Sequence, residues 1–559
     1  NARPENTLEY TTLCRAPVRV CTTQKGGQMV WISAVVYLVF IACASYFLSR
    51  GHTRGSEGFF LAGRSLTGTF IAGSLLLTNI SAEQIVGLAG SAYAFNFSSM
   101  AWEVTAVITI MIAALFLLPK FLARGFTTLP EYLGQRFGRP VQVASVILFL
   151  LGYGLVTIPS VLYSGTIAVL ETFSADFATL LTGQTGFIVS MIVIALIGTA
   201  YTVAGGLRAV AVSDTLNGLG LVLFGFLIPI LALQQVGDGS MFAGWQVLVA
   251  NHPEKLNAIG SNTDPTPFIT LFTGMLFANL AYWGTNQYVI QRTLAAKNLA
   301  AGQMGMLSAG FFKLLIPFFV MVPGVVAFHL YGPGLGSMDQ AYPRLVGDIL
   351  PPYLTGLFLA VLLGTVFSSF NSLLQSAATM ITYDVYVPMQ ARPVNDAERV
   401  RVGRWACLAI TVMGLLVAPS LQLAPEGLWQ LIRKFTGFYN IPLISIVLAA
   451  LFIPRASGKT AFGVILWHIP IYAVITFVVD TGIHFIHWYG ILFVLEMAAL
   501  ATFRNTADVA KATANPTPAH TQVDIDLTPW RYRWVAVGLL CAGIICLYII
   551  LSPLGVAEL

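Results

Sequence analysis

The chain has 559 residues, of which 57% are hydrophobic and 9% are charged, with a formal net charge of +5. Soluble domains carry roughly 25% charged residues, so this composition leaves too little polar surface for a water-soluble protein of this size. The apolar residues also form long runs, which are typical of transmembrane helices. The sequence therefore predicts an all-α integral membrane protein with the lipid bilayer as a partner and no nucleic-acid partner.

Three common functional motifs are missing from the sequence. The fragment Gly458-Lys459-Thr460 ends like a phosphate-binding loop, but that motif needs a glycine where this chain has Ile453. The seven histidines form no HExxH zinc motif, and the six cysteines form no CxxC pair. We therefore expect neither an ATP-driven pump nor a membrane enzyme.

The apolar runs predict about fourteen transmembrane spans. In chain order they lie near residues 29–48, 68–92, 99–122, 141–173, 185–203, 207–234, 268–286, 302–330, 352–384, 399–418, 426–453, 457–480, 484–503 and 533–553. The polar segment 1–28 precedes the first methionine, Met29, so we expect it to be non-native or disordered and leave it out of the fold.

The distribution of Lys and Arg predicts the orientation in the membrane. Cytoplasmic loops carry an excess of these residues, and the loops after odd-numbered spans hold about twenty of them. The loops after even-numbered spans hold only Lys255 and Arg344. We therefore expect both termini outside the cell, which is the periplasm for a bacterial inner membrane, and an Ala/Thr/Pro-rich cytoplasmic linker at 504–532.

Two predicted spans carry polar residues that favour an interrupted helix. One contains residues 77–84 with Asn79, and the other contains residues 278–284 with Asn279. Asn and Ser bond to local backbone and weaken a helix, and unwound backbone at membrane depth persists only where it lines a wet cavity. We expect both spans to break there. The alternative is that each Asn bonds a neighbouring helix.

The two interrupted spans also divide the chain. Each opens a block of five spans, 68–234 and 268–453, and the odd number makes the blocks antiparallel, as in transporters built from inverted repeats. One extra transmembrane helix, 29–48, precedes the blocks. Three additional helices follow them within 457–553.

Ionisable residues inside spans are candidate functional residues, because a charge at membrane depth is costly. They are Glu103, Asp214, Lys313, Arg433 and Lys434, with Glu83 beside the first predicted break. Glu103 follows Trp102, and a carboxylate beside an aromatic ring can accept sugar hydroxyls while the ring covers a CH face. The alternative is a structural ion pair between Glu103 and Lys313.

Adjacent hydroxyls follow Gly364 and Thr365 in the ninth span. Ser368 and Ser369 can supply two neutral oxygens to a sodium ion, and carbonyls freed at a broken helix would complete its shell. The alternative is that both hydroxyls bond back to the preceding helical turn.

From about residue 30 the chain resembles the sodium:solute symporters, and among them the bacterial sodium/galactose symporter branch. The resemblance rests on residues 57–66, 79–84, 279–287 and 291–297 and on the pair Ser368-Ser369. It implies a LeuT-type core of two inverted five-helix repeats. It also implies sodium-coupled uptake of a small-molecule sugar, galactose-like or glucose-like, by alternating access.

The resemblance also implies site residues. The sodium ion would bind the backbone carbonyls of Leu77, Ile80 and Thr365 and the hydroxyls of Ser368 and Ser369. Asp214 matches an acidic residue that the family links to sodium release or to a second ion. The sugar would contact Asn79, Gln84, Glu103, Asn279 and Lys313, with Tyr282 stacked on its ring as the inner gate.

Two departures from the family pattern bear on the substrate. Ala106 stands where the family has a sugar-contacting serine, and Arg433 stands where it has a sugar-contacting glutamine. An arginine adds a fixed cation with a planar donor fork, so a sugar acid or another small anion is an alternative substrate. Arg433 could instead turn to Glu103 or extend to the cytoplasmic side. Other solutes, such as an amino acid, a vitamin or a carboxylate, and a membrane sensor or channel are further alternatives.

Overall fold

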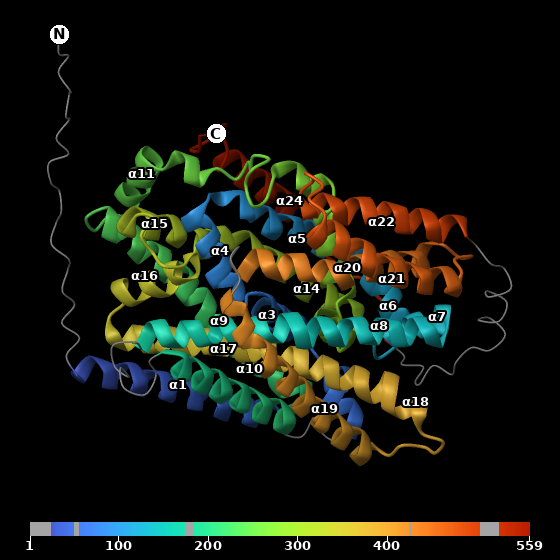
Figure 1. The fold of residues 1–559 in the computed structure, drawn as a ribbon. Helices are drawn as coiled ribbons and strands as arrows, with labels where there is room; N and C mark the ends of the chain where they lie inside the picture. The colour runs from blue at the N-terminus through green and yellow to red at the C-terminus, as the bar shows by residue number, and fades with distance from the viewer. Residues whose placement is uncertain (1–23, 50–54, 174–182, 424–427, 504–524, 559) are drawn as a thin grey trace, which may run out of the picture.

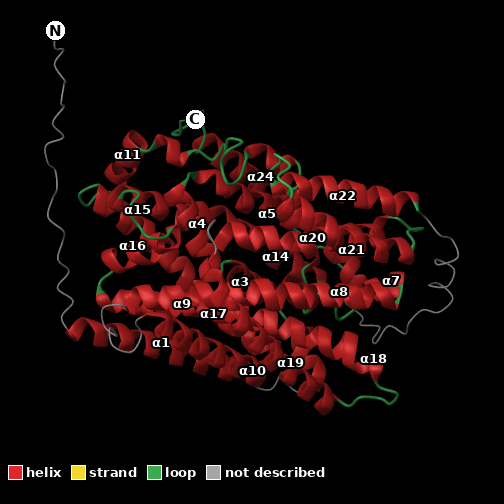
Figure 2. Cartoon of the chain, viewed as in Figure 1, coloured by secondary structure: helices red, strands yellow, loops and turns green. Residues whose placement is uncertain are grey.

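The computed structural model describes residues 24–49, 55–173, 183–423, 428–503 and 525–558. These residues form a bundle of helices joined by loops, with no strand over the described ranges (Figures 1 and 2). The expectations for 1–28 and for the linker at 504–532 fall largely on residues 1–23 and 504–524, which lie outside the described residues.

Many of the helices are long, and several continue one another through π-helical turns. The first half contains α1 (Gln24–Ser49), α2 (Gly55–Leu61), α3 (Gly68–Asn79), α4 (Ala82–Ala94), α5 (Met100–Ile112), α6 (Leu118–Arg124), α7 (Leu129–Phe137), α8 (Arg139–Gly152), α9 (Ile158–Phe173), α10 (Gly183–Val236) and α11 (Met241–Asn251). The second half contains α12 (Met275–Thr285), α13 (Gln287–Leu294), α14 (Leu299–Ile316), α15 (Val322–Tyr331), α16 (Ala341–Ile349), α17 (Pro352–Met380), α18 (Val387–Met389), α19 (Asp396–Val417), α20 (Leu428–Phe452), α21 (Gly458–Ala473), α22 (Phe485–Thr502) and α24 (Arg533–Ile550).

The described helices confirm a membrane-spanning architecture. Eleven of them are long and apolar enough to cross a membrane, and the bent pair α3–α4 makes a twelfth. The other two predicted spans, 29–48 and 268–286, fall on α1 and on α12, which are helical but do not meet these criteria within the described residues. The count of fourteen therefore stays a prediction.

The first predicted break is confirmed. α3 ends at Asn79 and α4 begins at Ala82, and the two axes differ by 55°. Ile80 (φ −83°, ψ 78°) and Ser81 (φ −92°, ψ 167°) lie between them outside helical geometry. The amide of Ile80 still bonds the carbonyl of Leu76 at 2.8 Å, and beyond it the regular helical ladder ends.

The predicted position of the second break is wrong. Residues 278–284 lie inside α12, and the interruption falls at Asn286 (φ −69°, ψ 122°), between α12 and α13. Asn279 stays within the helix, and its Nδ2 donates to the carbonyl of Met275 one turn earlier, at 3.4 Å. This single back-bond does not weaken the helix enough to interrupt it here.

A tyrosine from another helix holds the second break open. The hydroxyl of Tyr153 donates to Asn286 Oδ1 at 2.6 Å and accepts from the amide of Tyr288 at 3.3 Å. Tyr153 opens the π-helical turn η4 (Tyr153–Thr157) between α8 and α9. Polar groups released by the interruption are thus satisfied from inside the protein, as the membrane interior requires.

A glycine divides the long helix α10 into the two spans that the sequence predicts. Gly206 has φ 62° and ψ −176°, and a Cβ there would lie 3.1 Å from the carbonyl oxygen of Phe59. Essentially only glycine occupies this backbone region without strain. The kink therefore depends on the residue type as well as on the close approach of α2.

We predict that Gly206→Ala lowers the stability of the protein by about 1–3 kcal/mol, because alanine is strained in this conformation. The measurement is the apparent melting temperature of the purified protein in detergent. Gly463→Ala is the matched control, since Gly463 lies in α21 with no atom within 4 Å of an added Cβ. Equal melting temperatures for the two variants would contradict the assignment.

Candidate functional site

A buried carboxylate joins three helices next to the first break. Glu103 on α5 accepts hydrogen bonds from Gln84 on α4 and from Lys313 on α14, one at each carboxylate oxygen. Glu103 and Lys313 also form an ion pair, and all three side chains are buried. The alternative of a structural Glu103–Lys313 pair is therefore present in the structure. Each carboxylate oxygen keeps a second lone pair for another donor.

Arg433 lies between two indole rings. Its guanidinium carbon is 4.6 Å from the centroid of Trp102 on α5 and 3.9 Å from the centroid of Trp429 on its own helix, α20. Glu83 and Glu103 are close enough to act on its charge, but among the described residues Arg433 forms no ion pair within 4 Å. The alternative that Arg433 turns to Glu103 is not met by a direct ion pair, and the guanidinium instead stacks on aromatic faces, for which arginine is well suited.

Several buried polar atoms around this cluster have no hydrogen-bond partner among the described residues. The acceptors are Asn79 Oδ1, Glu83 Oε2 and Gln84 Oε1. The donors are the Nε1 atoms of Trp102, Trp283 and Trp429 and the Nε of Arg433. Buried polar atoms are almost always bonded in folded proteins, so a group of them in one place indicates a binding site for a polar molecule.

The predicted gate and the two asparagines lie on the helices that border this cluster. Tyr282 on α12 lies near the side chains of Asn79 and Tyr288. Its ring meets those of Trp283 and Tyr288 edge-on, at centroid distances of 5.4 Å and 5.7 Å. Asn279 is buried about one turn before Tyr282 on α12.

The predicted sodium residues meet where α17 faces the end of α3. Ser369 Oγ donates to the carbonyl of Thr78 at 3.4 Å, and Leu77 precedes Thr78 in the last turn of α3. Thr365 and Ser368 lie within the preceding turn of α17 and are buried. Ile80, the fifth predicted residue, is the first residue of the break. The last carbonyls of a helix lack intrahelical partners, so this end of α3 can offer oxygen ligands.

A fully buried arginine lies beside these oxygens, and the sequence analysis did not single it out as a site residue. Arg292 donates from Nε to Ser74 at 2.7 Å and from its other nitrogens to Ser372 and to the carbonyl of Tyr288. Its Nη2 lies 3.7 Å from Asp214, which also accepts from Ser74 at 2.6 Å.

The sequence contains conflicting indications about the position of Arg292. Arg292 follows the predicted span 268–286, where its charge resembles that of a loop residue. Two features indicate a buried position. Asp214 needs a cation at membrane depth. Arg292 also lies in residues 291–297, one of the segments that resemble the symporter family. Asp214 also lies near Ser368, and neither Asp214 Oδ1 nor the Ser368 hydroxyl has a hydrogen-bond partner among the described residues.

The two groups of residues share one element. Asn79 and Gln84 border the Glu103 cluster, while Thr78 bonds Ser369, and all of them lie within seven residues of the interrupted helix. The described residues contain no cluster of three or more His, Cys, Asp or Glu side chains that could hold a metal ion. The oxygens at the end of α3 are neutral, and neutral oxygens suit a monovalent cation.

The pattern that describes the Sodium:solute symporter family matches residues 59–467. The chain belongs to this family. It is 38% identical over 518 residues to the uncharacterized symporter YidK of Escherichia coli, covering 92% of this chain and 89% of that protein. It is 32% identical to a sodium/glucose cotransporter of Vibrio parahaemolyticus, covering 78% of this chain and 82% of that protein. The chain is therefore a multi-pass, sodium-coupled solute symporter and not an enzyme.

A solved structure confirms the fold. A Na⁺-coupled sialic acid symporter in a substrate-bound, outward-open state superimposes with a TM-score of 0.72 at 20% identity, over 88% of this chain and 98% of that one. The LeuT-like architecture that the sequence resemblance implied is thus present.

We predict that Arg292→Met destabilises the protein by about 3–5 kcal/mol, because it leaves the carboxylate of Asp214 buried without its cation. The double variant Arg292→Met with Asp214→Asn recovers part of that loss, since it removes the unpaired charge. The measurement is thermal stability in detergent. Arg392→Met is the control, because Arg392 pairs with Glu398 at the surface and surface pairs contribute little. A double variant as unstable as the single one would contradict the pairing.

Proposed function

We propose that this symporter couples the entry of Na⁺ to the uptake of a neutral, hydroxyl-rich solute, a sugar of the galactose or glucose kind. The observation that carries the proposal is the mixture of unpartnered donors and acceptors around Glu103. A hydroxyl group both donates and accepts, so a molecule with several hydroxyls can satisfy indole N–H groups and amide oxygens together. A sodium/glucose cotransporter among the relatives supports the same class of substrate.

In this proposal the solute lies between the interrupted helix and the aromatic side chains. Asn79, Gln84 and Asn279 supply amide groups, and Glu103 accepts from hydroxyls while Lys313 holds it in place. Arg433 contacts the solute from α20. Tyr282 lies toward the second break and serves as the inner gate.

The charge balance of the site favours a neutral solute over an anion. Glu83 and Glu103 bring two acidic groups, and Lys313 and Arg433 bring two basic groups, so the formal charges cancel. The ammonium of Lys313 is already paired with Glu103, and the guanidinium of Arg433 is stacked on Trp429 and Trp102. An anion such as a sugar acid remains the second candidate, because the Nε of Arg433 is buried without a partner among the described residues.

Sodium would bind one helical turn away, in the same interrupted segment. We assign its ligands to the carbonyls of Leu77, Ile80 and Thr365 and the hydroxyls of Ser368 and Ser369, and we assign a secondary ion role to Asp214. A cation there stabilises α3 against α17, and this fixes the segment that carries Asn79 and Gln84. The affinities for sodium and solute are then coupled, and the coupling is reciprocal.

The same proposal includes the arrangement in the membrane. Residues 68–234 and 268–453 form two inverted repeats, each opened by an interrupted helix, and alternating access moves one block relative to the other around the shared site. The Lys/Arg bias supports cytoplasmic loops after odd-numbered spans and both termini outside. The relatives from Escherichia coli and Vibrio parahaemolyticus support a bacterial inner membrane.

Uptake by purified protein in liposomes tests the proposal and the site together. We expect an inward sodium gradient to drive accumulation of at least one member of a panel of neutral sugars. Glu103→Ala should abolish this uptake, because it removes a proposed acceptor for the hydroxyls of the sugar. Ser369→Ala should raise the sodium concentration for half-maximal uptake by tenfold or more, because it removes a proposed sodium ligand. Sugar uptake at the same rate with and without a sodium gradient, or uptake by both variants at the rate of the wild type, would overturn the proposal.

Arg433→Gln separates the two classes of substrate. For a neutral sugar we expect uptake to persist, with a change in KM of about tenfold or less, because a glutamine can still exchange hydrogen bonds with hydroxyls. For an anionic solute the loss of the fixed cation should abolish uptake. Competition of labelled sugar uptake by sugar acids, measured in the wild type and in Arg433→Gln, is the deciding measurement.

A further inference from the structure

The first half of α20 is held by side chains from the two helices that follow it. Tyr489 on α22 donates its hydroxyl to the carbonyl of Arg433, and Tyr472 on α21 donates to the carbonyl of Lys434 at 2.7 Å. Nε2 of His468 on α21 lies 3.1 Å from the carbonyl of Gly437. The three side chains are buried. Helical carbonyls already accept from their own helix, so three extra donors on one short segment are a specific feature of this packing.

A glycine makes this close approach possible. A Cβ on Gly437 would lie 2.4 Å from the ring of Tyr489 and 2.5 Å from the ring of Tyr472. Neither ring can move away cheaply, because both are buried and the two rings pack against one another at a centroid distance of 5.9 Å. The position therefore requires glycine, and α20 lies directly against the tyrosines.

The third donor is fixed by an acidic partner. His468 Nδ1 lies 2.6 Å from Glu496 Oε1 on α22, and neither side chain is exposed. Both ring nitrogens of His468 thus face acceptors, a carboxyl group and the Gly437 carbonyl. The pair satisfies both contacts when it holds one shared proton, because Nε2 then always carries the hydrogen that the carbonyl of Gly437 accepts.

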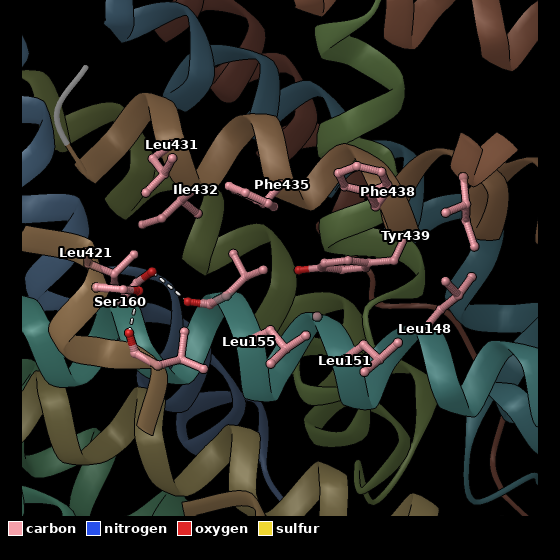
Figure 3. A pocket seen from close by; sticks show the side chains of 15 residues that line it. Leu148, Leu151, Leu155, Ser160, Leu421, Leu431, Ile432, Phe435, Phe438 and Tyr439 are labelled. Carbon is pink, nitrogen blue, oxygen red and sulfur yellow. Dashed lines mark hydrogen bonds between the residues drawn. The ribbon is translucent and has the colours of Figure 1, made fainter. Parts of the chain in front are cut away.

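On another side α20 lines an apolar cavity. A cavity of about 460 Å³ lies between α20 and the helices α8 and α9 (Figure 3). From α20 it is lined by Leu431, Ile432, Phe435, Phe438 and Tyr439. Tyr439 packs closely against Gly152 of α8 beside this cavity, and the polar contacts to the first carbonyls of α20 come from α21 and α22.

We propose that His468, Tyr472 and Tyr489 are positioning residues that set where Arg433 lies in the solute site. Through them α21 and α22, which lie outside the two five-span blocks, tune the affinity for the solute without touching it. This inference rests on the proposed place of Arg433 in the solute site.

The test uses Tyr489→Phe and Tyr472→Phe in the full-length protein reconstituted in liposomes. Each variant removes one hydroxyl and keeps the ring. We expect the KM for the transported sugar to rise about three- to tenfold, the loss of one hydrogen bond, while the half-maximal sodium concentration changes less than twofold. In an Arg433→Ala background the same tyrosine variants should leave the sugar KM unchanged, because no side chain at this position is then left to contact the sugar.

Ser445→Ala is the matched control, since Ser445 is buried on α20 and its hydroxyl bonds the carbonyl of Ile441 within the same helix.

Glu496→Gln and Glu496→Met form a second matched pair. Glutamine can donate its amide to Nδ1 and leave Nε2–H for the carbonyl of Gly437, so its sugar KM should stay near that of the wild type. Methionine removes the partner of Nδ1, and we expect the sugar KM to rise.

Hydrogen exchange of the peptide around residues 430–440 reports on the contacts independently of the solute. It should rise in both tyrosine variants and stay unchanged in Ser445→Ala. The inference is overturned if exchange does not rise, if sugar KM and sodium dependence change equally, or if the tyrosine effect persists without Arg433. A wild type with no sodium-driven sugar uptake overturns the proposed function instead, whatever the exchange experiment shows.

Discussion

The architecture of this protein depends on one short gap in a hydrogen-bond ladder. Between Asn79 and Ala82 the backbone leaves helical geometry in the interior of the bundle, where the released groups need partners from the protein, from water in a cavity or from a bound ion. The neighbouring helices provide some of these partners. α17 does so with Ser369, and the side chains that follow the gap, such as Gln84, reach the buried carboxylate of Glu103. A local irregularity thus determines which polar residues the surrounding helices carry.

Two buried carboxylates follow the same rule, because each has a basic side chain within 4 Å. Glu103 has Lys313, and Asp214 has Arg292 together with Ser74. Arg433 differs, since indole faces and more distant carboxylates compensate it in place of a direct ion pair. A cation held by stacking can change its hydrogen-bond partners more easily than one held in a salt bridge, and this suits a side chain beside a solute that enters and leaves.

Much of this organisation could be predicted from the sequence, and the misses have physical reasons. Long apolar runs identify spans directly, and Asn79 beside Ser81 marked the first interruption. Asn279 has the same sequence pattern but lies inside an intact helix, where it bonds back to the preceding turn. The actual interruption is at Asn286, and its partner Tyr153 is distant in sequence. Arg292 was missed because a charge after a span looks like a loop charge until its buried partner is known. The contacts of Tyr489 and His468 with α20 have no sequence signature, because carbonyl acceptors are the same at every residue.

The cancellation of charge in the solute site has an electrical consequence. If the acidic and basic side chains of the site neutralise one another, each transport cycle with a neutral sugar moves only the charge of its sodium ions across the membrane. One elementary charge crossing 100 mV represents roughly 2.3 kcal/mol, which sustains a concentration ratio of about fifty at 25 °C. The current that a membrane electrode records would then be proportional to the rate of transport. A monovalent anion carried with one sodium ion would instead be transported without any net current.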